Sequence, residues 1–200
     1  RGGLSFVNIS ASMLFAGISG TAISDTASLG AVMIPAMKKE GYDSDFSCAI
    51  TAASSTVGPI IPPSLPMIIA ATLSGLSVGK LFLAGAIPGL LLGLGLMLVA
   101  YFVAKKKNYP KHPKSTPLQI FKSFINTFWA LLMTAIILFG IIGGVFTPTE
   151  ASVVAVLYVL FIGLFVYKKL NLRNISVVVL DSMKTTASLM ILVGFANLFG

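Results

Sequence analysis

Charged residues are scarce in this sequence. Only 10% of its 200 residues are charged and 56% are hydrophobic, whereas about a quarter of a typical soluble domain is charged. A single cysteine, Cys48, leaves no disulfide framework within the chain, and a single histidine, His112, lies far from it, which argues against a metal site built on the two. The apolar runs are too long for barrel strands, so the composition predicts an all-α integral membrane protein.

The net charge of +8 comes largely from lysines in short loops between apolar runs. Basic residues in such loops set membrane topology, so the charge does not indicate a nucleic-acid partner. The sequence contains no nucleophile–base pair, no phosphate-binding loop beside a lysine and no histidine cluster, so we predict no catalytic residues and no enzyme. Because the chain begins with Arg1 and ends in an apolar run, we expect an internal piece of a longer membrane protein.

The positive-inside rule orders the apolar segments. All basic clusters fall on one side, predicted to be cytoplasmic, and only Lys80 falls outside. The predicted segments are a hairpin over Leu4–Met37, a span over Phe46–Leu73 broken at Val57–Pro63, a full span over Leu81–Ala104, an interfacial helix over Leu118–Thr127, spans over Phe128–Val145 and Ala151–Tyr167, and a surface helix over Asn171–Thr186 that leads into another span.

Two interruptions distinguish this chain from a simple bundle of spans. Within Leu4–Met37, the small polar residues Ser19-Gly20-Thr21 favour the tip of a re-entrant hairpin, although two full spans of about 17 residues would also fit. The second interruption contains Pro59, Pro62 and Pro63, which lack N–H groups and disfavour helix before them. Unwound backbone at membrane depth persists only inside protein or against a water-filled cavity, and transporters bind ions and substrates there.

The chemistry of the two interruptions points to a cation and an anion. Hydroxyls and the carbonyls at half-helix ends make a hard-oxygen site suited to Na⁺, whereas exposed amides favour carboxylates. Close packing of small residues is the structural alternative. Asp25 is either a cation ligand or proton carrier, or a capping carboxylate in the first turn of the returning helix.

Five motifs resemble the large membrane subunit, of the DctM type, of tripartite ATP-independent periplasmic (TRAP) transporters. The likeness covers nearly the whole chain, with its elements in order. The motifs are Ala16–Gly30, Ile34–Tyr42, Thr51–Ser64, Leu83–Gly89 and Gly143–Ala151.

The resemblance implies Na⁺-driven uptake of small organic acids, such as sialic acid or C4-dicarboxylates, across the bacterial inner membrane. It also implies a periplasmic substrate-binding protein and a small DctQ-type membrane subunit, sometimes fused to the large one, as partners. The implied fold is an inverted-repeat elevator transporter. In it, residues 1–75 form the first hairpin and broken helix, 76–127 the connecting span, basic loop and interfacial helix, and 128–200 the truncated start of the second repeat.

The resemblance also assigns site residues. Na⁺ would lie among Ser19, Gly20, Thr56, Val57, Gly58 and Pro59, and substrate near Thr21, Ser24, Asp25, Ser55, Pro62 and Ser64. The span Leu81–Ala104 is a candidate for the static scaffold. A second cation site and half of the substrate pocket would lie beyond Gly200, so we do not expect the chain to transport alone. A passive channel and an assembly subunit without its own site are the alternative functions.

Overall fold

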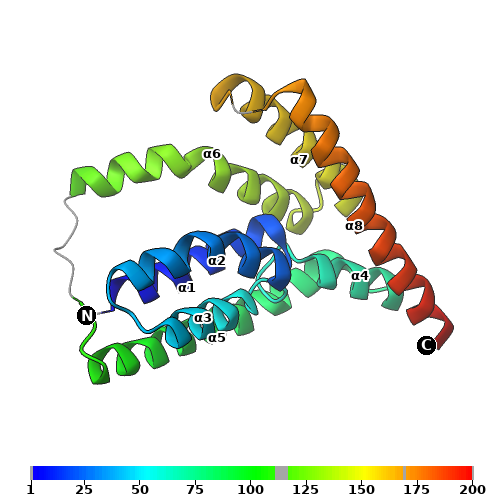
Figure 1. Cartoon of the computed structure of the whole chain (residues 1–200). Coiled ribbons are helices and arrows are strands. Elements are labelled where there is room, and N and C mark those ends of the chain that lie inside the picture. The colour runs from blue at the N-terminus through cyan, green and yellow to red at the C-terminus, as the bar shows by residue number, and fades with distance from the viewer. Residues whose placement is uncertain (1, 111–116, 169, 200) are drawn as a thin grey trace. The chain divides into compact units, whose positions relative to one another are not determined.

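The computed structural model describes residues 2–110, 117–168 and 170–199, and these residues are helical, with no β-strand among them (Figure 1). The predicted all-α class is therefore confirmed. The chain forms two compact units, Arg1–Pro148 and Thr149–Gly200. In chain order, the elements are α1 (Gly3–Ser19), α2 (Ala22–Lys39), α3 (Ser44–Ser55), α4 (Leu65–Ser74), α5 (Val78–Lys106), α6 (Pro117–Ile142), α7 (Pro148–Phe161), the π-helical turn η1 (Ile162–Val166) and α8 (Leu172–Phe199).

Helices α1 and α2 form the predicted hairpin, with its tip at the predicted residues. Gly20 ends α1 with a φ of 61°, a left-handed conformation that glycine adopts without strain, and its N–H donates to the Ala16 carbonyl. Thr21 is extended and begins α2, because its hydroxyl oxygen accepts a hydrogen bond from the Ser24 N–H at 3.4 Å. A turn of two residues therefore reverses the chain.

Helices α3 and α4 form the predicted broken helix. The interruption covers residues 56–64, one residue longer at each end than the sequence predicted. The carbonyl of Val57 stabilises the interruption, because it accepts hydrogen bonds from the N–H groups of Ile60 and Ile61. Ser64 begins α4: its hydroxyl accepts from the Met67 N–H and donates to the Pro59 carbonyl. The unwound segment is thus a set of defined turns.

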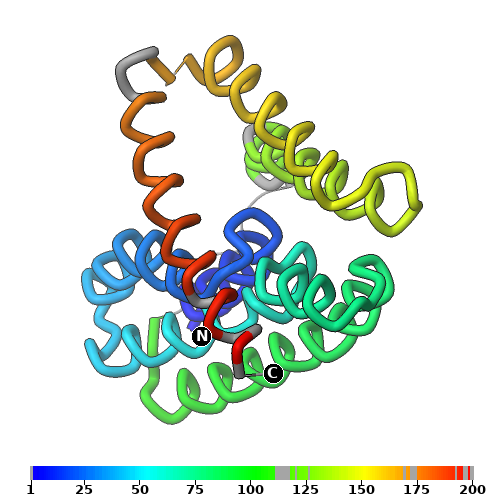
Figure 2. Tube along the Cα trace, turned by 90° about the vertical axis from the view of Figure 1, so that its right-hand side faces the viewer, coloured from blue at the N-terminus to red at the C-terminus, as the bar shows by residue number. Residues whose placement is uncertain are grey.

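Helix α5 confirms a long helix over the predicted span Leu81–Ala104 and packs on both the hairpin and the broken helix (Figure 2). Its glycines let these elements approach closely. Gly93 lies against Met13 of α1, Gly89 lies against Ile61, and a Cβ at Gly85 would be 2.8 Å from the Ile60 carbonyl oxygen. The opposite face of α5 carries exposed Leu90, Leu91 and Leu94 among other apolar residues. These residues give α5 a small-residue face toward protein and a large apolar face outward.

Helix α6 is continuous across the point where the sequence predicts a change from interfacial helix to span. No Gly or Pro lies between Leu118 and Phe139, and the Thr127 hydroxyl donates to the Ser123 carbonyl within the helix. Thr127 therefore does not end a helix. The interfacial position of Leu118–Thr127 and the functional divisions at residues 75 and 127 remain predictions.

In the second unit, α7 with η1 confirms the predicted helix over Ala151–Tyr167, and α8 runs as one helix where the sequence predicts a surface helix leading into a span. In the described part of the chain, three helical segments are long and apolar enough to cross a membrane. They are Val78–Lys106, Pro148–Val166 and Ile175–Phe195.

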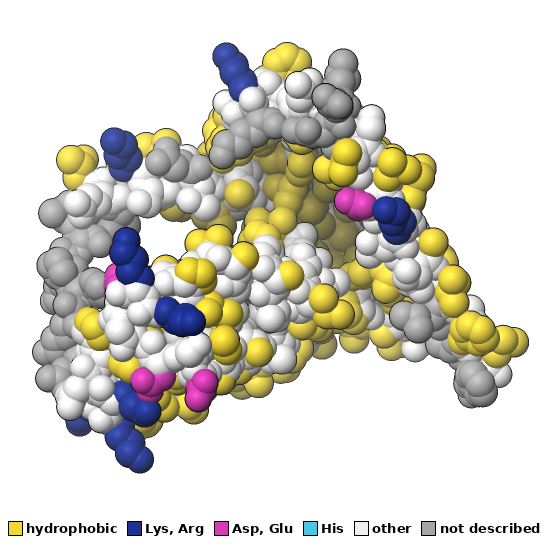
Figure 3. Space-filling view, viewed as in Figure 1, with side chains coloured by type: hydrophobic (Ala, Val, Ile, Leu, Met, Phe, Trp, Pro, Cys, Tyr) yellow, Lys and Arg dark blue, Asp and Glu magenta, His cyan; other side chains and the backbone are white. Residues whose placement is uncertain are grey.

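One contact tests the predicted topology within the first unit. The Lys107 ammonium lies 2.6 Å from the Asp43 carboxylate, so the loop Lys38–Asp45 and the cluster Lys105–Lys107 lie at the same end, as predicted. Several lysines and acidic residues gather at this end of the unit, whereas its sides are largely uncharged (Figure 3). The predicted loop around His112, and the basic residues Arg1 and Lys169, lie outside the described residues.

Candidate functional site

The hairpin tip lies directly against the interruption of the broken helix. A Cβ at Gly20 would be 3.0 Å from the Leu65 nitrogen and 3.3 Å from the Pro63 carbonyl oxygen. From the other side, a Cβ at Gly58 would be 3.5 Å from the Thr21 carbonyl carbon. Two glycines therefore allow backbone-to-backbone contact where any side chain would separate the segments. The two interruptions face each other, as a shared cation site requires.

Asp25 is the charged group at this junction. It is fully buried in the first turn of α2, and one carboxylate oxygen, Oδ1, accepts a hydrogen bond from the Ser19 hydroxyl across the tip. The other oxygen, Oδ2, has no hydrogen-bond partner among the described residues. Thr21, rather than Asp25, caps α2, so the capping role considered for Asp25 belongs to Thr21. The carboxylate instead joins the two arms of the hairpin.

The unpartnered oxygen of Asp25 faces Gly58, since a Cβ at position 58 would be 2.7 Å from Oδ2. A buried carboxylate oxygen without a partner is costly unless a cation or water satisfies it. The same Cβ would be 3.1 Å from the Ser55 carbonyl oxygen and 3.5 Å from the Thr21 carbonyl carbon, so carbonyl groups lie near the carboxylate. Oxygen atoms are the ligands that hard cations prefer.

The remaining predicted residues divide by burial. Val57, Gly58, Pro62, Ser55 and Ser64 are buried and Pro59 is half-buried, and the Ser55 hydroxyl donates to the Thr51 carbonyl at 2.8 Å. Thr56 and Ser24 have exposed side chains, and the Thr56 hydroxyl donates to the Ala53 carbonyl at 2.7 Å. In this arrangement, neither exposed side chain lies within the buried junction.

A buried polar seam between α1 and α3 was not recognised from the sequence. The Asn8 amide donates to the Thr51 hydroxyl at 2.7 Å, and the hydroxyls of Ser12 and Ser54 are 2.8 Å apart. All four residues are fully buried, and Asn8 Oδ1 has no partner among the described residues. The sequence does contain a pattern that predicts this seam, because the polar residues Ser5, Asn8 and Ser12 recur at helical spacing on α1. The seam fixes the register of the hairpin against α3.

Two helices begin at the junction. α2 begins after Thr21 and α4 after Ser64, and both starts lie beside Gly20. Helix starts present unpaired N–H groups and a partial positive charge, which favour carboxylates. The junction therefore brings together a buried carboxylate, carbonyl oxygens and the starts of two helices.

A hairpin whose tip contacts a broken helix, both packed on α5, which is long and apolar enough to cross a membrane, is typical of membrane-embedded secondary transporters. The comparison with known families agrees. The family model for the DctM component of the tripartite ATP-independent periplasmic transporters matches residues 1–200, and the chain belongs to this family. The resemblance drawn from the five motifs is thereby confirmed.

Curated relatives match along the whole chain. It is 44% identical to the sialic acid TRAP transporter permease protein SiaT of Haemophilus influenzae, of which it covers 32%. It is 44% identical to the sialic acid TRAP transporter large permease protein SiaM of Vibrio cholerae and 43% identical to the C4-dicarboxylate TRAP transporter large permease protein DctM of Pseudomonas aeruginosa, and it covers 47% of each. The chain spans less than half the length of these relatives, which are named as permeases.

Proposed function

We propose that this chain forms the first half-site of a Na⁺-coupled transporter that takes up a small organic acid. The observation that carries the proposal is the buried Asp25 oxygen without a partner, enclosed where the hairpin tip meets the broken helix. A cation bound at this point would satisfy Oδ2 and neutralise a carboxylate that is otherwise costly to bury. The cation would thus hold the tip against the interruption.

The residues fall into two proposed roles. Ser19, Gly20 and Gly58 supply hydroxyl or backbone oxygens around the cation, and Thr56 contributes through its backbone, since its side chain is exposed. Val57 and Pro59 line the site, but their carbonyls already accept hydrogen bonds from Ile60 and Ile61 and from Ser64. Asp25, which the resemblance places near the substrate, joins the cation ligands because of its unpartnered oxygen. Thr21 and Ser64, at the starts of α2 and α4, are placed to orient a substrate carboxylate, with Ser24, Ser55 and Pro62 near them.

The class of substrate comes from the relatives. The names of the relatives specify sialic acid or C4-dicarboxylates, which are organic anions at neutral pH. The helix starts at the junction suit such anions, and coupling to an inward Na⁺ gradient would supply the energy for accumulation. We therefore propose uptake of a carboxylate substrate across the bacterial inner membrane, with a periplasmic binding protein and a small DctQ-type membrane subunit as partners.

The mechanism we propose is an elevator movement in which the hairpin and broken helix move as a body. α5 was expected to belong to the static scaffold. Its glycine face interlocks with α1, α4 and the interruption, and such close packing resists sliding. We therefore assign α5 to the moving body. We also propose a re-entrant position for the hairpin, because its tip is small and polar and buried Asp25 follows directly after it.

The test is uptake by the full-length complex in proteoliposomes with its binding protein. Labelled sialic acid and C4-dicarboxylates are each offered with and without an inward Na⁺ gradient. Accumulation of one of them only with the gradient is the expected result. Flux that never exceeds equilibration would indicate a channel. No uptake by a folded complex with any of these substrates would indicate an assembly subunit and would contradict the proposal.

A further inference from the structure

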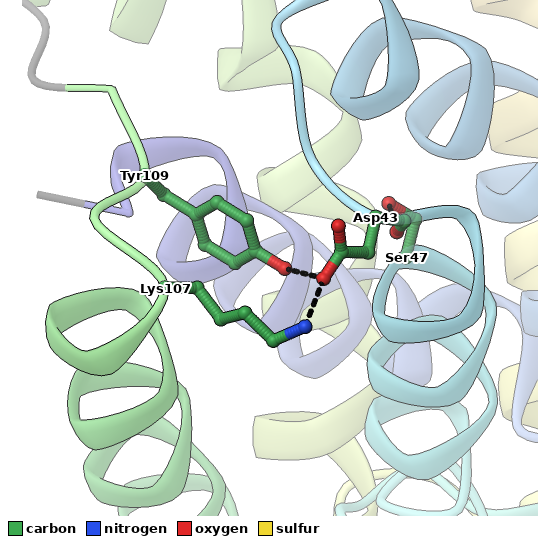
Figure 4. Close-up of polar contacts among 4 residues, drawn as sticks. All are labelled: Asp43, Ser47, Lys107 and Tyr109. Atoms are coloured by element: carbon green, nitrogen blue, oxygen red, sulfur yellow. Dashed lines mark hydrogen bonds and ion pairs between the residues drawn. The ribbon is translucent and has the colours of Figure 1, made fainter.

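The end of the first unit opposite the hairpin tip contains a second ionic cluster, formed by Asp43, Lys107 and Tyr109 (Figure 4). Asp43 lies in the turn between α2 and α3. Its Oδ2 accepts from the Lys107 ammonium at 2.6 Å and from the Tyr109 hydroxyl at 3.1 Å. Its backbone carbonyl accepts from both the N–H and the hydroxyl of Ser47. One residue therefore joins the start of α3 to the end of α5.

Buried aromatic rings lie next to these polar contacts. The ring of Tyr109 has its centroid 4.3 Å from that of Tyr42 and 5.4 Å from that of Phe46. Tyr42 and Tyr109 are each only 4% exposed, and they share one hydrophobic cluster with Ile9, Met37, Ile50, Ala100 and Ala104. The side chains of this cluster come from α1, α2, α3 and α5 and from the segment that follows α5.

The same segment is also fixed to the start of α1. The Gly2 N–H donates to the Pro110 carbonyl at 3.2 Å, and Gly2 lies so close to Ala104 that a Cβ at position 2 would overlap it. Residues 107–110 are thus held by the α2–α3 turn through Asp43 and by α1 through Gly2. These residues therefore follow α5 in the chain but remain in contact with the hairpin.

We propose that Asp43, Lys107 and Tyr109, which we call the Asp43 clamp, stay in contact throughout the transport cycle, so that residues 107–110 travel with the hairpin. The connection from the moving body to α6 then begins only after Pro110. This proposal rests on the proposed elevator function and adds to it the point at which the moving body ends.

The two ends of the hairpin differ in a way that supports a permanent clamp. At the tip, the carboxylate oxygen of Asp25 is buried without a partner, so that contact depends on a ligand. At the clamp, Asp43 already has two donors, and the ring of Tyr109 packs on Tyr42 and Phe46. An exposed ion pair alone is worth only about 0–1 kcal/mol, so the buried rings provide most of the attachment and the ion pair fixes its orientation.

The test is a cross-link across the clamp in the full-length complex. Asp43→Cys and Lys107→Cys are introduced together in a background where exposed Cys48 is replaced by serine, and a short bifunctional thiosulfonate joins them. The two single variants treated with the same reagent are the controls. We expect the joined pair to form and Na⁺-dependent uptake to match that of the same variant after the link is cleaved by reductant.

Loss of uptake on cross-linking, restored by reductant, would contradict the proposal because the clamp would then have to open. Failure of the pair to cross-link would also contradict it. The uncross-linked variant must show Na⁺-dependent uptake in the same preparation, which separates failure of the clamp from failure of the proposed function. As a second variant, Asp43→Lys with Lys107→Asp restores the opposite charges, and we expect it to regain the thermal stability lost in Lys107→Asp alone, where two carboxylates repel each other; no recovery would contradict the proposal.

Discussion

Gly58 lies against the carboxylate of Asp25, so closely that a Cβ at position 58 would be 2.7 Å from Oδ2 and 3.1 Å from the Ser55 carbonyl oxygen. We predict that Gly58→Val in the full-length protein abolishes uptake while the protein still inserts into the membrane, because the branched side chain separates the tip from the interruption. Gly95→Val is the matched control, since a Cβ there meets nothing within 4 Å. Normal uptake by Gly58→Val would contradict this assignment.

Gly20 and Gly75 offer a pair in which backbone strain and close contact can be separated. Both have positive φ angles, 61° and 66°, but only Gly20 touches the backbone of another segment. Gly75→Ala should cost about 1 kcal/mol of conformational strain. Gly20→Ala should cost the same strain and should also make uptake less dependent on the Na⁺ gradient. Thermal stability and Na⁺-dependent uptake are measured for both variants. Equal losses of uptake in the two variants would contradict the contact assigned to Gly20.

The helix order, the hairpin tip and the broken helix could be predicted from the sequence because glycine and proline impose local conformations. Pro59, Pro62 and Pro63 interrupt a helix whatever surrounds them. The continuity of α6 across Thr127 could not be predicted in the same way, because amphipathic and uniformly apolar stretches can share one helix. The partner of Lys107, 64 positions away at Asp43, depends on tertiary packing that no local pattern encodes.

The candidate site could be predicted by residue type but not by geometry. Ser19, Gly20 and Gly58 were expected there and lie at the junction. The unpartnered oxygen of Asp25 became visible only once burial and hydrogen bonds were known, because a first-turn carboxylate is equally typical of a cap. The seam of Asn8 with Thr51 likewise requires knowing which helices pack together.

The seam between α1 and α3 should stabilise the hairpin by a small, measurable coupling. Ser12→Ala, Ser54→Ala and the double variant form a double-mutant cycle for the 2.8 Å hydroxyl pair. We expect a coupling energy of about 0.6 kcal/mol, the size found for hydrogen bonds between membrane helices. Unfolding of the detergent-solubilised protein gives the four stabilities. Strictly additive losses would show that the two hydroxyls do not interact.

The Asp43 clamp predicts a dependence of stability on pH. The Lys107 ammonium, and after it the Tyr109 hydroxyl, hold the pKa of Asp43 below its ordinary value of 3.8. Because the pKa is lower in the folded state, the stabilisation is present above 3.8 and is lost as the pH falls through the folded pKa. The melting temperature of the wild-type protein should exceed that of Asp43→Asn at neutral pH, and the difference should shrink under acid. A difference that is constant with pH would contradict the ion pair.

In our proposal, the junction of the hairpin tip with the broken helix binds the coupling cation through Asp25. The most direct measurement is the Na⁺ concentration for half-maximal uptake in proteoliposomes, for the wild type and for Asp25→Asn. Thr26→Ala, whose hydroxyl bonds within α2, is the control. Removing a charged ligand worth about 1.5–3 kcal/mol should raise that concentration roughly tenfold or more, with the control unchanged. Identical Na⁺ dependence in wild type and Asp25→Asn would contradict the account.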